Sequence, residues 1–199
     1  MRKIFFGYFL IMIRLLVKGF DIFPDPIGYG LVYLGAIELM ERAPGFSQLK
    51  NLAVAGALFS LAILGFDVYT FAFGTTPTAI FVVGILGAAG GLLITYLCGT
   101  KLLESFSQLP LNENGTTALE KLKKTWSSYF TAMAISTGIV LYIFVTGSPS
   151  AFMIVLIAGV FSFVFAVMYL FRLNRFTLDE VAGLYAPVDP HAFQSYYRD

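Results

Sequence analysis

Five ionisable residues in apolar stretches of the chain carry the chemistry that most needs an explanation. They are Arg14, Lys18, Asp21, Asp25 and Asp67. The first four are spaced four, three and four residues apart, so a regular helix would place them on one face. Two cations and two carboxylates would then form a polar stripe of zero net charge, to which Asp67 would add a carboxylate that pairs with Lys18.

The depth of these groups in a bilayer follows from a helical rise of about 1.5 Å per residue. Counted from Lys3, Arg14 lies about 16 Å along the first apolar run, close to the bilayer centre. Counted from Lys50, Asp67 lies about 25 Å along a later run. Charged groups at membrane depth are costly and usually face a cavity or a partner. One interpretation is therefore a polar site or pathway that opens to the outer face.

The alternative interpretation is a structural ion-pair cluster that joins the first three helices. In that case the ammonium group of Lys18 would extend outward to the interface along its aliphatic stem. Arg14 favours the functional interpretation, because its depth leaves its guanidinium little room to reach water.

Residues for other kinds of chemistry are scarce. Cys98 is the only cysteine and lies in an apolar run, whereas His191, the only histidine, lies in the polar tail. The chain has no HExxH or GxSxG motif and no metal-spaced acidic cluster. We expect no metal, no cofactor and no catalytic residue, and a membrane-embedded enzyme is the third and least favoured function.

The composition indicates an integral membrane protein. Of 199 residues, 58% are hydrophobic and only 13% are charged, whereas soluble domains are about 45–50% apolar and about 25% charged. A compact core could not bury so much apolar surface. The net charge of +1 provides no basic field for nucleic acid.

Six apolar runs predict an all-α fold, a polytopic transmembrane bundle of six helices. Crossing the hydrocarbon takes about 20 apolar residues in a helix. Prolines and glycines mark the breaks between the runs. The expected helices cover residues 4–23, 27–40, 52–73, 78–103, 129–145 and 151–171.

The lysines and arginines of the short connections predict the topology. They precede the first helix, occupy the second and fourth connections and follow the sixth helix, whereas connections 24–26, 74–77 and 147–149 have none. Because cytoplasmic loops are enriched in these residues, both termini are expected in the cytoplasm. The chain then has one transmembrane domain, residues 1–175, and a cytoplasmic tail, 176–199.

Residues 117–128 form a basic amphipathic segment expected to lie on the anionic inner leaflet.

The expected fourth helix carries a face of small residues. They are Gly84, Gly87, Ala88 and Gly91. Such spacing lets two transmembrane helices approach closely. The face predicts packing against a helix of the same chain, of a second protomer, or of a partner membrane protein.

Residues 20–29 read FDIFPDPIGY. This segment resembles a signature, F-D-I-L/F-P-D-x-I-G-Y, of small multi-span membrane proteins of Gram-positive bacteria. The resemblance implies a location in the bacterial cytoplasmic membrane and brings no activity with it. Its two acids, Asp21 and Asp25, are also members of the polar stripe.

Two functions compete on this evidence. The first is transport of a small solute or ion through a polar site between the first three helices. The second is a non-catalytic subunit or regulator of a larger membrane complex, supported by the small-residue face and the short loops.

Overall fold

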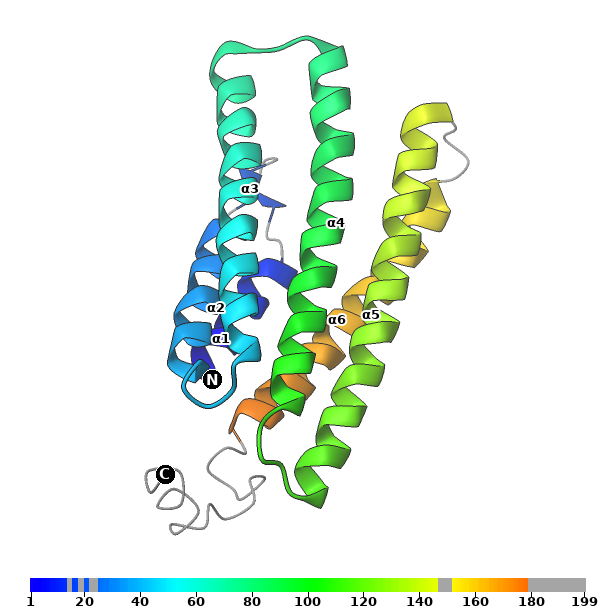
Figure 1. The fold of residues 1–199 in the computed structure, drawn as a ribbon. Coiled ribbons are helices and arrows are strands. Elements are labelled where there is room, and N and C mark those ends of the chain that lie inside the picture. Colours follow the sequence, from blue (N-terminus) through cyan, green and yellow to red (C-terminus); the bar gives the residue numbers. More distant parts are fainter. Residues whose placement is uncertain (14–15, 18–19, 22–24, 147–151, 179–199) are drawn as a thin grey trace.

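The computed structural model describes residues 1–13, 16–17, 20–21, 25–146 and 152–178. This part of the chain forms six helices and one pair of two-residue strands, β1 and β2, so the all-α class is confirmed (Figure 1). In chain order the elements are α1 (Arg2–Met12), β1 (Leu16–Val17), β2 (Phe20–Asp21), α2 (Asp25–Leu39), α3 (Gly45–Phe73), α4 (Pro77–Ser107), α5 (Glu113–Thr146) and α6 (Phe152–Leu178).

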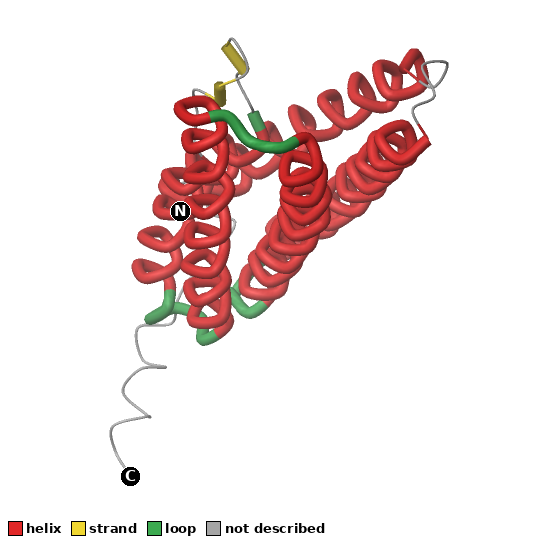
Figure 2. The backbone as a smooth tube through the Cα atoms, turned by 90° about the horizontal axis from the view of Figure 1, so that it is seen from above, coloured by secondary structure: helices red, strands yellow, loops and turns green. Residues whose placement is uncertain are grey.

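The six helices form a closed ring. Each helix packs against the next one in the sequence, and α1 also packs against α6. The hairpins α3–α4 and α5–α6 stay close together at one end and diverge toward the other end, where the turn between α3 and α4 lies (Figures 1 and 2). The shorter helices α1 and α2 accompany only part of α3 (Figure 1).

Four of the helices, α3 to α6, are long and apolar enough to cross a membrane. Large apolar side chains cover their outer surfaces, such as Leu58, Phe71 and Phe161. In water such surfaces would be unfavourable, whereas in lipid they face the acyl chains. The described chain is therefore that of a membrane-embedded protein.

The two N-terminal helices are shorter than a crossing requires. With 11 and 15 residues, α1 and α2 extend about 16 Å and 22 Å, against about 30 Å of hydrocarbon. The six expected helices are thus present, but helix length alone accounts for four crossings.

The expected first helix, residues 4–23, is wrong in its second half. Helix α1 ends at Met12, and Ile13 has an extended backbone (φ −101°, ψ 95°). Strands β1 and β2 then pair antiparallel, Leu16 with Asp21 and Val17 with Phe20. β-branched Ile13 and Val17 favour extended backbone, and Gly19 disfavours a helix interior. Asp21 and Asp25 therefore lie on two different elements, β2 and α2, and do not share one helical face, whereas Arg14 and Lys18 lie outside the described residues.

The fifth helix begins much earlier than expected. It starts at Glu113, where the side chain of Asn112 accepts a hydrogen bond from the Gly115 amide at 2.8 Å. The amphipathic segment 117–128 is thus the first part of α5. Its apolar face, Leu119, Leu122 and Trp126, is buried in the protein core and does not lie on a lipid surface.

The core is concentrated at the end of the ring where α1 and α2 are present. All six helices contribute to it, for example with Ile4, Val32, Leu49, Leu102, Leu122 and Leu173. The first two helices pack closely because Gly7 and Gly28 face each other, and a Cβ on Gly7 would come within 2.6 Å of the Gly28 carbonyl oxygen. This small-residue contact is of the kind that brings helix backbones together in membranes.

Candidate functional site

All lysines and arginines of the described residues lie toward the same end of the ring as the core. They are Arg2, Lys3, Arg42, Lys50, Lys101, Lys121, Lys123, Lys124, Arg172 and Arg175. At this end Lys3 forms an ion pair with Glu38 and so joins α1 to α2. The guanidinium of Arg172 donates to the Lys121 carbonyl at 2.8 Å and to the hydroxyl of buried Thr125, and so joins α6 to α5.

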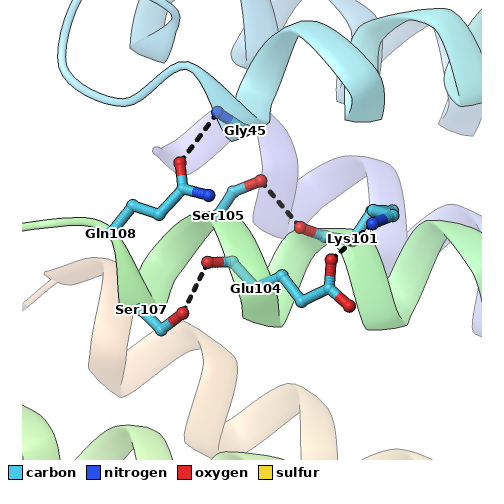
Figure 3. A network of polar contacts seen from close by, with 6 residues as sticks. All are labelled: Gly45, Lys101, Glu104, Ser105, Ser107 and Gln108. Carbon is cyan, nitrogen blue, oxygen red and sulfur yellow. Dashed lines mark hydrogen bonds and ion pairs between the residues drawn. The ribbon is translucent and has the colours of Figure 1, made fainter.

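A polar network at the same end connects α3 to α4 (Figure 3). The Gly45 amide, at the start of α3, donates to the side-chain oxygen of Gln108 at 2.9 Å. On α4, Lys101 forms an ion pair with Glu104 at 2.5 Å, and the Ser105 hydroxyl donates to the Lys101 carbonyl at 2.7 Å. The bond from Gly45 to Gln108 satisfies an amide at the start of α3 and joins the two helix ends, whereas the other two contacts lie within α4.

The residues predicted for the polar site are only partly described. Arg14 and Lys18 lie outside the described residues, and so does the side chain of Asp21, whose backbone belongs to β2. Asp25 is the first residue of α2 and is half-buried, and its carboxylate lies near the positive end of that helix. Asp67 is exposed on α3. The predicted pair between Asp67 and Lys18 therefore stays a prediction.

The small-residue face of α4 is open. A Cβ on Gly84 or Gly91 would meet no atom within 4 Å, and one on Gly87 would make only ordinary contact, at 3.4 Å, with Ile63. Two other glycines of α4 make the close contacts. Gly90 lies against the ring of Phe59 on α3, and Gly99 lies against the indole of Trp126 on α5.

A cluster of aromatic side chains with polar atoms is buried where α1, α5 and α6 meet. Its centre is Tyr169, whose ring centroid lies 5.2 Å from that of Trp126, 6.2 Å from that of Tyr8 and 6.4 Å from that of Tyr129. All four residues are almost fully buried. We call these four residues the hydroxyl cluster.

The sequence did not single out the hydroxyl cluster as a site. Its members lie near the basic ends of three helices, a position typical of the aromatic belts that anchor membrane proteins at the interface. In the folded chain they face each other and not the interface. Only the packing of α1 on α6 brings Tyr8 and Tyr169 together, and no local signal reports that contact.

Comparison with protein-family models, with curated proteins and with solved structures finds no match for this chain. Within the part of the chain that the structure describes, no three His, Cys, Asp or Glu side chains are grouped as a metal site would require. The function must therefore be argued from the helices and from the polar groups among them.

Proposed function

We propose that this chain carries a small solute or ion across a membrane, through a polar pathway beside α1, α2 and α3. The observation that supports the proposal is the break in the first apolar segment, where α1 ends at Met12 and extended backbone follows. Non-helical backbone at membrane depth is tolerated only where protein buries it or where it lines water. Interrupted helices of this kind form the substrate and ion sites of many transporters.

The pathway would include the charged residues that interrupt this segment. Arg14, Lys18, Asp21 and Asp25 come from residues 13–25, and Asp67 comes from α3, which packs against α2. Opposite charges in one hydrated site would lower the cost of keeping each of them away from bulk water. The site would open toward the end of the ring that carries no described Lys or Arg.

We propose that the basic end of the ring faces the cytoplasm of a bacterial cell and that both termini lie on that side. The positive-inside rule supports this orientation, because every described Lys and Arg lies toward that end. A crossing by the first apolar segment is also compatible with the length that its residues can span, as six crossings require. Helix α1 extends about 16 Å, and the next five residues can span up to about 16 Å more when extended.

A flux assay with purified protein in liposomes tests the transport function. The probes are protons, sodium, potassium and chloride, each followed with an entrapped ion-sensitive dye. We expect the wild-type chain to accelerate the flux of at least one probe, and Arg14→Ala and Asp67→Asn to abolish that flux. The matched control is Lys123→Gln, which removes an exposed charge from α5 outside the pathway. Unchanged flux in both pathway variants would eliminate the pathway.

A second function, a non-catalytic subunit of a larger membrane complex, is favoured by the open face of α4. Gly84 and Gly91 meet no other part of the described chain, and such faces accept a second helix in membranes. Purification in a mild detergent should then recover a different membrane protein in stoichiometric amount. Gly84→Leu and Gly91→Leu should release this partner, whereas a wild-type chain that purifies alone, as a monomer or as a homo-oligomer, would argue against this function.

A further inference from the structure

The hydroxyl cluster contains three polar atoms that have no hydrogen-bond partner within the described chain. They are the hydroxyl oxygens of Tyr8 and Tyr169 and the indole nitrogen of Trp126. The side chains are 1%, 0% and 5% exposed, so solvent at the protein surface does not reach these atoms. Three such atoms in one cluster are unusual, because buried polar groups are almost always hydrogen-bonded to protein or to ordered water.

The three atoms belong to side chains whose rings are in contact but whose polar atoms form no hydrogen bonds with one another. Tyr169 contacts both Tyr8 and Trp126, yet no hydrogen bond joins any two of the three. The indole N–H is a donor only, and a phenol hydroxyl can both donate and accept. The cluster therefore lacks an acceptor for the indole and a partner for each of the two hydroxyls.

The chemistry of the hydroxyl cluster favours an uncharged partner for these three atoms. The four side chains of the hydroxyl cluster carry no charge at neutral pH, so nothing in the cluster would balance an ion. Water has the required chemistry, because a water molecule can accept a hydrogen bond from the indole N–H and can donate to or accept from a phenol hydroxyl. Buried waters typically make about three hydrogen bonds to such otherwise unsatisfied groups.

We propose that Tyr8, Trp126 and Tyr169 bind at least one water molecule inside the ring, between α1, α5 and α6. The site lies on α1, α5 and α6, whereas the charged residues of the proposed pathway come from residues 13–25 and from α3. It does not depend on transport, since the evidence for it is the burial and the unpaired atoms of these three side chains. Its water would complete the contact between the first and the last helix.

Hydroxyl-radical labelling of the intact protein in lipid vesicles tests the proposal. Radicals generated from water modify a buried side chain only when a water molecule lies beside it. We expect Tyr8, Trp126 and Tyr169 to be modified several-fold faster than Phe46 and Phe106, which are 0% exposed aromatic residues without polar atoms. Modification as slow as that of the two phenylalanines would overturn the proposal.

A second measurement uses the fact that Trp126 is the only tryptophan of the chain. The Raman band that reports hydrogen bonding of an indole N–H can therefore be assigned to this residue alone. We expect the hydrogen-bonded band in the wild type and a shift toward the free band in the Tyr8→Phe, Tyr169→Phe double variant. Tyr142→Phe, at an exposed position on α5, should leave the band unchanged.

The two measurements together separate water from a protein partner. A hydrogen-bonded indole with slow labelling of all three side chains would mean that a protein group satisfies Trp126, which contradicts the proposal. A free indole band in the wild type contradicts it as well. Neither result bears on ion flux, so the site and the proposed transport can fail separately.

Discussion

The indole ring of Trp126 on α5 occupies the space that a side chain at position 99 of α4 would need. A Cβ added to Gly99 would overlap the six-membered part of the ring. The contact fixes the distance between α4 and α5 next to the hydroxyl cluster. It also makes the only tryptophan a reporter of the packing between these two helices.

Gly99→Ala should therefore destabilise the protein, by about 1–3 kcal/mol, because overpacking forces the ring or the helices to shift. The measurements are the thermal midpoint in detergent and the emission maximum of Trp126, both of which should change. The control is Gly91→Ala on the same helix, where the added Cβ meets nothing within 4 Å. At that position the higher helix propensity of alanine should stabilise the folded protein by up to about 1 kcal/mol. Equal effects of the two substitutions would contradict the contact.

The close approach of α1 and α2 leads to a second prediction. A Cβ on Gly28 would lie 2.9 Å from the Gly7 carbonyl oxygen and 2.7 Å from Ile11 Cγ1. Gly28→Ala should separate the two helices and lower the thermal midpoint, because a backbone atom cannot move aside as a flexible side chain can. Gly30→Ala, two residues further along α2, has open space and should have no such effect. A Gly28→Ala protein as stable as Gly30→Ala would mean that the helices are not this close.

A third prediction concerns the hydrogen bond between α5 and α6. The hydroxyls of Ser136 and Ser162 are 2.8 Å apart. A double-mutant cycle of the two alanine substitutions should give a coupling of about 0.6 kcal/mol, the average for hydrogen bonds between membrane helices. Each hydroxyl also lies within hydrogen-bond distance of a carbonyl of its own helix. Because a hydroxyl has only one proton to donate, the serine that donates to the other hydroxyl does so in competition with its own carbonyl, and the single substitutions alone are not diagnostic. A coupling of zero would show that the hydroxyls do not bond to each other.

The orientation of the ring can be read with two introduced cysteines. Thr75→Cys lies in the turn between α3 and α4, and Asn114→Cys lies in the first turn of α5 at the opposite, basic end. The native Cys98 is buried and should not react. An impermeant maleimide added to intact cells should label Thr75→Cys and spare Asn114→Cys until the membrane is opened. The reverse pattern would contradict a cytoplasmic basic end.

The elements that local sequence determines were predictable. The turn between α3 and α4 is an example, because Gly74 has a left-handed φ of +72° and Thr76 accepts a hydrogen bond from the Ala79 amide just before Pro77 begins α4. Both features follow from residue types that favour these positions. The expected end of the third helix, residue 73, agrees with the structure for the same reason.

The elements that depend on distant contacts were not predictable. An amphipathic face such as that of Leu119 and Leu122 fits a lipid surface and a protein core equally well, and only the neighbouring helices decide between them. The end of α1 at Met12 was missed because the apolar run continues beyond it. The hydroxyl cluster joins residues from the first and last helices, so no sequence window contains it.

The contact of α1 with α6 has a consequence for biosynthesis. Helix α1 leaves the ribosome long before α6 is synthesised. The contact between Tyr8 and Tyr169 can therefore form only after residue 169 has been added to the chain. A nascent chain that stops after α5 would lack the contacts of α6 with both α5 and α1, and its five helices would form an open arc. Of the six described helices, the last to be made is thus the one that closes the ring, and a stop codon before residue 152 should leave a product that quality-control proteases recognise.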